Sequence, residues 1–155
     1  MGIAVGLDFG TTNSVVTYED KNGKVKAFKL NGSPLIPSVI YFKTRDDYLI
    51  GNRALTMSGK NFAGMISGFK TKLNEDNMPY EVTLEDGSNF KITPKMAVKY
   101  YLNKLMSQVQ EYLMKKKIGD AQIDRAVITV PTKFNDKANQ AIKSAAAAAM
   151  QLLKL

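Results

Sequence analysis

The feature that most constrains the fold is the pair Asn22–Gly23, which stands between two segments rich in alternating apolar residues, 14–19 and 24–30. An Asn-Gly pair in that setting is typical of a two-residue β-hairpin turn, because both positions of such a turn need positive φ. A further apolar run at 3–9 precedes these segments and is typical of a buried strand. Residues 3–30 therefore predict a three-stranded antiparallel meander.

The middle of the chain is mixed. Two prolines in residues 31–38 break the meander pattern. Short apolar runs then predict strands at 38–42, 48–51, 80–84 and 89–92, and helices around 53–58 and 65–73. Residues 85–88 carry a hairpin-turn signature between the last two of these strands.

The end of the chain predicts a helix, a strand and a second helix. Thr93 can cap the first of these helices, Pro94 fits its first turn, and Gly119 is expected to end it. Its apolar stripe is formed by Val98, Leu102, Leu105, Val109 and Tyr112. Branched residues predict a strand at 123–130, stopped by Pro131, and Asn135 or Asp136 can cap the last helix. This order predicts an α/β fold in which roughly residues 33–92 are an insertion.

Composition excludes several kinds of chemistry. Among its 155 residues the chain has no cysteine and no histidine, so it has no disulfide, no thiol nucleophile and no Ser-His-Asp triad. Carboxylates, lysines, hydroxyls and backbone amides remain, and these suit a hard metal such as magnesium. No apolar run approaches the roughly 18 residues that a membrane span needs, and no secretory signal is apparent, so we expect a cytoplasmic protein without a membrane partner.

The formal net charge of +8 is compatible with an anionic partner. The lysines are dispersed along the sequence, apart from residues 115–117, which close a predicted helix where positive charge complements the helix dipole. No aromatic residues alternate with a basic stripe. We therefore interpret the charge as solvated lysine-rich faces and expect no nucleic-acid partner.

The stretch GLDFGTTNS, residues 6–14, is the first candidate site. Gly10 would let the backbone turn and let an anion approach, successive amides and the hydroxyls of Thr11 and Thr12 could bind phosphate, and Asp8 could hold magnesium. The same residues are common in ordinary turns, so the spacing leaves both interpretations open. It is not a Walker A loop.

Lys70, in SGFKTKL, is the second candidate. A lysine can neutralise the charge that develops on a transferring phosphoryl group. The spacing does not decide whether Lys70 or Lys72 would have this role. The alternative is that Lys70 is an ordinary solvated lysine without a catalytic role.

GLDFGTTNS resembles the first phosphate motif of the 70-kDa heat-shock chaperone family, the DnaK-like proteins, within the actin and sugar-kinase ATPase superfamily. Further segments resemble this family in the same order, from about residue 3 to about residue 144. They are IPSV at 36–39, GNRA at 51–54, Phe69–Lys70, AVITVP at 126–131 and FND at 134–136. The last two together are highly specific.

The resemblance implies a ribonuclease-H-like core with an inserted small α+β subdomain. The core would comprise residues 1–32 and 93–155, and the insertion residues 33–92. Together they would form only the first lobe of the nucleotide-binding domain, so that 1–155 supplies one wall of an ATP site that lies between two lobes.

The resemblance also implies roles for particular residues. Asp8 matches the acid that orients the water shell of magnesium, and Lys70 matches the catalytic lysine that reaches the γ-phosphate. Pro131 matches a proline that relays nucleotide state to the peptide-binding domain. The residues that match the loop contacting the β- and γ-phosphates are Gly10, Thr11, Thr12 and Asn13.

Two departures from the family pattern stand near the end of the chain. The family's relay pairs its proline with an arginine eight residues later, where this chain has Asn139. Five consecutive alanines, 145–149, replace the glycine and larger residues that are usual in the last helix, and they offer little volume for a core.

The implied function is ATP hydrolysis by a chaperone that couples nucleotide state, with ATP/ADP and Mg²⁺, to binding and release of unfolded peptides. J-domain co-chaperones and nucleotide exchange factors are the expected partners. The chain alone is expected to bind nucleotide weakly or not at all and to self-associate through the apolar surface of its open cleft face. The alternatives are a partner-binding lobe without ATPase activity, or another member of the superfamily such as a sugar kinase or an actin-like filament protein.

Overall fold

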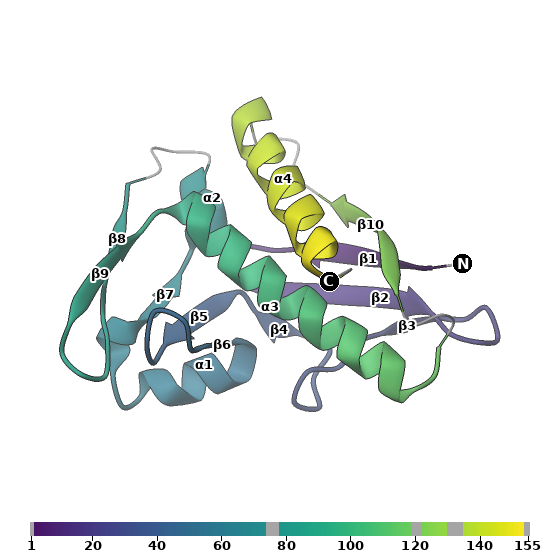
Figure 1. The fold of residues 1–155 in the computed structure, drawn as a ribbon, viewed down its shortest axis with the longest axis horizontal. Coiled ribbons are helices and arrows are strands. Elements are labelled where there is room, and N and C mark those ends of the chain that lie inside the picture. The colour runs from purple at the N-terminus through teal and green to yellow at the C-terminus, as the bar shows by residue number, and fades with distance from the viewer. Residues whose placement is uncertain (1, 74–77, 119–121, 130–134, 154–155) are drawn as a thin grey trace.

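Five strands form the main sheet of the computed structural model, which describes residues 2–73, 78–118, 122–129 and 135–153. The strands follow the order β10-β1-β2-β3, and β4 pairs with β2 (Figure 1). β10 runs parallel to β1, whereas the other pairs are antiparallel. The bounds are β1 Ile3–Phe9, β2 Asn13–Glu19, β3 Val25–Ala27, β4 Ile36–Pro37 and β10 Ile123–Thr129.

The meander predicted from residues 3–30 is confirmed. The turn itself is longer than the expected two residues: Gly23 has a φ of +77°, Asn22 does not have positive φ, and the N–H of Asp20 donates to the carbonyl oxygen of Lys24 at 2.8 Å. Asp20 supports the turn, because its carboxylate accepts hydrogen bonds from the backbone N–H groups of Asn22 and Lys24 at 2.8 and 2.9 Å.

Residues 39–92 form two small sheets and two short helices. The first sheet has the order β6-β5-β7, and the second is the hairpin β8-β9. The bounds are β5 Val39–Phe42, β6 Tyr48–Ile50, α1 Gly51–Ser58, β7 Met65–Ser67, α2 Phe69–Leu73, β8 Tyr80–Thr83 and β9 Asn89–Ile92, with a 3₁₀ turn at Phe62–Gly64. The predicted strands and the helix around 53–58 are confirmed within one or two residues.

The prediction of a helix over 65–73 is wrong for residues 65–67. Residues Met65–Ser67 are extended and pair with β5, and Ile66 is buried in the core. Gly68 then takes a φ of +69°, a conformation that suits glycine, and the helix begins only at Phe69.

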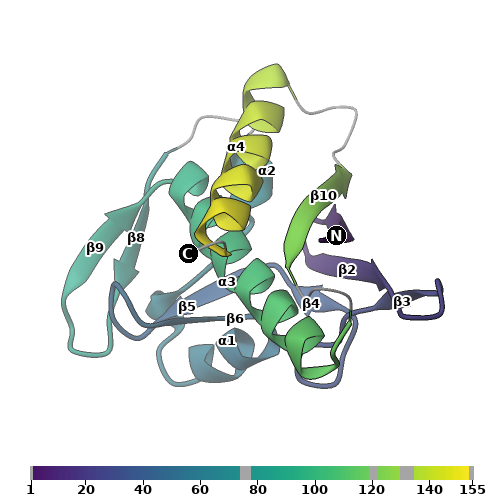
Figure 2. The same cartoon turned by 45° about the vertical axis from the view of Figure 1, so that its right-hand side comes forward.

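Two long helices, α3 Pro94–Lys115 and α4 Asp136–Leu153, cover one face of the main sheet (Figures 1 and 2). Thr93 caps α3 as predicted, since its hydroxyl accepts a hydrogen bond from the N–H of Met96 at 3.2 Å. Asn135 caps α4, because its Oδ1 accepts from the N–H of Ala138 at 2.8 Å. α3 ends at Lys115, and Gly119, the expected end, lies outside the described residues.

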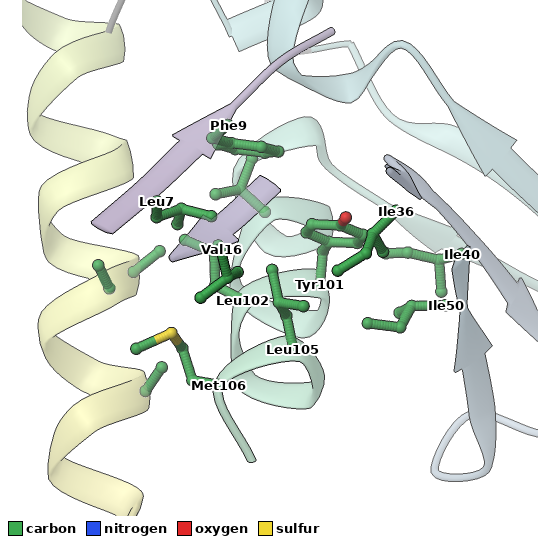
Figure 3. Close-up of a cluster of buried hydrophobic side chains, with 14 of the residues drawn as sticks. Leu7, Phe9, Val16, Ile36, Ile40, Ile50, Tyr101, Leu102, Leu105 and Met106 are labelled. Atoms are coloured by element: carbon green, nitrogen blue, oxygen red, sulfur yellow. The ribbon is translucent and has the colours of Figure 1, made fainter. Parts of the chain in front are cut away.

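A continuous hydrophobic core joins the main sheet, both long helices and the small sheets. In Figure 3, Met106 on α3 points toward α4, while Leu105 and Tyr101 point toward Ile40 and Ile50 on the other side. All five side chains are at most a few per cent exposed. The two regions therefore pack as one body in the described part of the chain.

The alanine run lies at the contact between α4 and the rest of the core. Ala145, Ala146 and Ala149 are buried, and small side chains allow α4 to approach α3 closely. A hollow of about 320 Å³ remains between α4 and β10, lined in part by Ala126, Ala146 and Met150. The small volume predicted for these alanines is therefore visible in the packing. No helix in the described residues is long and apolar enough to span a membrane.

Replacing Thr93 by alanine should remove the cap of α3 and lower the free energy of unfolding by about 1 kcal/mol. Thr93→Gly should recover most of this loss, because glycine is tolerated at a helix N-cap. Ser107→Ala, at an exposed position in the middle of α3, is the control and should not destabilise the fold. Urea denaturation measures the free energy of unfolding of the three variants and of the wild type. Equal values for wild type and Thr93→Ala would refute the capping role.

Candidate functional site

The segment GLDFGTTNS forms the end of β1, a tight turn and the start of β2. The N–H of Gly10 donates to the carbonyl oxygen of Asn13 at 3.0 Å and closes the turn. A Cβ atom at residue 10 would overlap that carbonyl oxygen, so this position requires glycine. The side chains of Thr11, Thr12 and Asn13 are exposed at the tip. The turn is thus a glycine-dependent loop with polar groups that face solvent.

A buried hydroxyl network holds this loop from behind. Ser38, only 2% exposed, donates from Oγ to the carbonyl oxygen of Gly10 at 2.9 Å. Its N–H donates to the carbonyl oxygen of Thr12 at 2.8 Å, and its Oγ lies 2.9 Å from the Oγ of buried Ser14. Because these bonds are shielded from water, they fix both sides of the turn relative to β4.

Asp8 is oriented by the neighbouring strand. Thr129 on β10 is the register partner of Asp8, and its Oγ1 donates to Asp8 Oδ1 at 2.8 Å. Asp8 is exposed, so its carboxylate remains open to solvent on the face of the sheet opposite the buried Leu7 and Phe9. The alternation of a strand places the carboxylate there.

Lys70 lies in α2 with its side chain buried against the end of β1. It is 3% exposed, and its Nζ lies 5.0 Å from the ring centroid of Phe9. Burial lowers the pKa of Lys70, and the charge of Asp8 opposes that shift. The ammonium group is therefore held in a weakly hydrated place within the electrostatic influence of Asp8.

Three aromatic rings position this lysine. The ring of Phe9 stacks on Tyr101 at a centroid distance of 5.6 Å, and Phe69 lies 6.3 Å from Phe9 and 5.7 Å from Tyr101. Phe69 directly precedes Lys70, so the cluster ties α2 to β1 and α3. Lys72 differs, because its Nζ lies 5.6 Å from the ring of Tyr80 on β8. The structure thus separates the two lysines that spacing alone could not.

The predicted relay concerns Pro131 and the position eight residues later, which is Asn139 in this chain. Pro131, expected to act as a relay, lies outside the described residues. Asn139 is half-buried in α4, and its Oδ1 is buried without a hydrogen-bond partner among the described residues.

Sequence reasoning missed the residues that orient the site. Ser38 belongs to the IPSV segment that carries the resemblance, yet no local pattern predicts that its hydroxyl reaches Gly10. Ser14 and Thr129 also lie in segments that carry the resemblance, 6–14 and 126–131, but no local pattern predicts their contacts, and Tyr101 gave no signal. Their contacts depend on strand register and on packing between distant segments.

The donor set suits an anionic oxygen ligand with a magnesium ion. In the described part of the chain no three acidic side chains gather into a metal-ligand group. Mg²⁺ usually keeps several waters and takes one or two carboxylates together with phosphate oxygens. One exposed carboxylate beside a glycine-dependent loop fits that requirement.

Comparison with known proteins decides the family. The model of the family described as "Hsp70 protein" matches residues 4–154. The chain belongs to the Hsp70 family. The match continues through the alanine run, which lies beyond residue 144 where the sequence resemblance was expected to end. The mixed α/β fold is that expected for an Hsp70 ATPase domain.

Curated members of the family align over most of the chain. The chain is 34% identical over 142 residues to "Chaperone protein DnaK" of Thermotoga petrophila and of Thermotoga maritima. It is 32% identical over 142 residues to the DnaK protein of Thermosipho melanesiensis. Each alignment covers 91% of this chain and 22% of the relative. The chain thus spans about a fifth of the length of these Hsp70 proteins.

Gly10→Ala should destabilise the protein by about 2 kcal/mol, because the added methyl group must displace the Asn13 carbonyl and open the turn. The matched control is Gly59→Ala after α1, where the new Cβ would make only an ordinary contact and the backbone is already helical. Chemical denaturation compares the free energies of unfolding of Gly10→Ala and Gly59→Ala. A Gly10→Ala protein as stable as the control would contradict the steric account of the loop.

The hydroxyl of Tyr101 donates to the carbonyl oxygen of Pro37 at 3.3 Å. Burial raises the pKa of Tyr101 to about 12, although the hydroxyls of Ser14 and Ser38 oppose the rise. The unfolded chain, with a tyrosine pKa near 10, releases this proton first. The stability linked to Tyr101 is therefore fully present below pH 10 and lost as the pH rises toward 12.

Tyr101→Phe should accordingly cost about 1 kcal/mol of unfolding free energy at pH 7, and this difference should shrink above pH 10. Denaturant titrations at pH 7, 9, 10 and 11 measure it, with tyrosinate absorbance to follow ionisation. A difference that stays constant or grows with pH would show that Tyr101 is not a buried, protonated donor.

Proposed function

We propose that this Hsp70 chain forms the phosphate-binding wall of an ATPase site in a chaperone that couples ATP hydrolysis to binding and release of unfolded peptides. The observation that carries the proposal is the arrangement at the end of β1. There a glycine-dependent loop and an exposed carboxylate from residues 6–14 meet a buried lysine from α2. Membership of the Hsp70 family supplies the reaction.

The loop would hold the β- and γ-phosphates. The exposed residues Thr11, Thr12 and Asn13 offer hydroxyl, amide and backbone donors. Gly10 allows the tight turn that presents them, because the Asn13 carbonyl oxygen lies where a Cβ atom of residue 10 would be. Ser38 would act as a positioning residue, because its two bonds to the loop fix the direction of these donors before the ligand arrives.

Asp8 would hold Mg²⁺ through its water shell, with Thr129 fixing the direction of the carboxylate. When bound, the ion would neutralise part of the triphosphate charge. Lys70 would stabilise charge on the γ-phosphoryl group. Its weakly hydrated position strengthens an attraction to phosphate that bulk water would screen.

The finer architecture belongs to the same proposal. A ribonuclease-H-like core of residues 1–32 and 93–155 with an inserted subdomain of residues 33–92 is supported by the parallel β10-β1 pair beside the meander and by the separate small sheets. The relay role of Pro131, J-domain and exchange-factor partners, the absence of nucleic-acid and membrane partners, and a cytoplasmic location remain predictions.

Self-association through the cleft face is supported by one observation. Val127 on β10 is 70% exposed, and strand register places it on the same face as Asp8. A partner lobe or a second copy of the chain would cover this side chain.

Lys70→Met tests the role of the lysine in ATP hydrolysis, because methionine keeps an apolar stem in the buried position but removes the charge. In a DnaK chimaera carrying these 155 residues as its N-terminal region, the turnover number should fall on the order of 100-fold. Lys72→Met is the matched control, two residues away, and should leave turnover within about twofold.

ATP binding by the same chimaeras separates catalysis from folding. Lys70→Met should retain most of the nucleotide affinity of the unsubstituted chimaera. Equal turnover for Lys70→Met and Lys72→Met would refute the catalytic assignment.

A further inference from the structure

Much of the positive charge of the chain gathers around two adjoining hollows of about 680 and 350 Å³. They share Lys29 and Tyr112 as lining residues, and together we call them the basic groove. Seven basic and two acidic side chains line it, a net charge of +5 out of the +8 of the whole chain. The basic residues are Lys21, Lys26, Lys29, Arg53, Lys104, Lys115 and Lys116, and the acidic ones are Asp20 and Glu111.

Folding produces this concentration from lysines that are dispersed in sequence. The β2–β3 turn, the segment after β3, α1 and the C-terminal half of α3 each contribute to the groove. Figures 1 and 2 show β3 beside the C-terminal end of α3. The side chains of Tyr18 on β2 and Tyr112 on α3 meet there, with their hydroxyl oxygens 3.4 Å apart.

Each of the two acidic side chains already forms an ion pair with a lysine of the groove. Asp20 Oδ2 lies 3.1 Å from Lys26 Nζ, while its Oδ1 accepts two backbone hydrogen bonds. Glu111 pairs with Lys115 at 3.4 Å. Five cations of the groove form no ion pair within the described part of the chain: Lys21, Lys29, Arg53, Lys104 and Lys116. The groove therefore has an excess of positive charge that an anionic partner can neutralise.

The floor of the groove argues against single-stranded nucleic acid as that partner. Tyr112 packs edge-to-face against Tyr18 and Phe28 at centroid distances of 6.0 and 5.2 Å, and Lys116 lies over its ring at 5.7 Å. Single-stranded nucleic acids are usually held by aromatic faces on which bases stack. Here the rings are engaged within the fold, whereas the lysines rise from the rim as point charges on flexible stems.

The groove is also separate from the phosphate loop. Asn13 begins β2 at the loop, and Tyr18 lies near the other end of the same strand. At about 3.3 Å per residue these positions are roughly 17 Å apart. A ligand in the basic groove therefore would not use the residues assigned to ATP.

We propose that the basic groove is a docking site for an acidic segment of a partner protein, an extended stretch rich in aspartate and glutamate. Its carboxylates pair with Lys29, Lys116 and their basic neighbours, and its backbone lies across the tyrosine floor. Attraction of this kind acts between largely exposed charges, so it weakens as salt is added.

A fluorescent decaglutamate peptide and the 155-residue chain test the proposal by anisotropy at 50 and 200 mM salt. The peptide should bind, and binding should weaken at the higher salt. The variant Lys29→Gln/Lys116→Gln should weaken binding at least tenfold. The control variant Lys99→Gln/Lys137→Gln removes the same charge from exposed positions outside the groove and should change the dissociation constant less than twofold.

Lysine acetylation of the unsubstituted chain gives a second measurement that no folding defect can disturb. Bound peptide should protect Lys29 and Lys116 but not Lys99 and Lys137. No binding, equal weakening in both double variants, or equal protection of all four lysines would overturn the proposal. So would tighter, Lys29- and Lys116-dependent binding of a polythymidine oligonucleotide or of phosphatidylserine vesicles.

Discussion

The side chain of Tyr101 is the point on which the geometry of the candidate site depends. Its ring stacks on Phe9 at an interplanar angle of 12° and packs against Phe69, while its hydroxyl donates to the carbonyl oxygen of Pro37. Phe9 precedes the loop glycine, Phe69 precedes Lys70, and Pro37 precedes Ser38. One buried residue on α3 thus sets the relative positions of the loop, the lysine and the hydroxyl that holds the loop.

This arrangement explains how an exposed, polar turn can be rigid. A hairpin turn of small residues has little packing of its own, so its conformation must be imposed by what lies beneath it. Here Ser38 and Ser14 form hydrogen bonds under the turn, and the aromatic cluster keeps water away from them. Donors that are fixed before a ligand binds need less reorganisation, which is the usual basis of electrostatic stabilisation in enzymes.

Features that depend on a few neighbouring residues could be predicted from the sequence. The Asn22–Gly23 turn, the Thr93 cap and the long apolar stripe of α3 arise from local conformational preferences and helical periodicity. Met65–Ser67 could not be predicted, because these residues become a strand only through pairing with β5. The same holds for the Thr129–Asp8 bond and for the choice between Lys70 and Lys72, which depend on register and on packing between distant segments.

The basic groove could not be predicted from the sequence either, because it also depends on packing between distant segments. The lysines are dispersed in the sequence, yet the fold brings them together at the end of β2 opposite the loop. One strand therefore separates two anion-attracting regions of different character. The loop region offers fixed donors and a buried cation for a compact ligand, whereas the basic groove offers flexible exposed cations for an extended one.

The most direct test of the central claim, that residues 10–13 bind phosphate, is an NMR titration of the ¹⁵N-labelled chain with Mg²⁺ and ATP. The account predicts that shifts saturating at millimolar nucleotide will be largest for the amides of Gly10, Thr11, Thr12 and Asn13. It also predicts that Ser38→Ala will make the nucleotide-induced shifts of the loop amides smaller, while other changes in the spectrum stay confined to the neighbours of residue 38. Unperturbed loop amides at saturating nucleotide, or shifts concentrated in the basic groove, would contradict it.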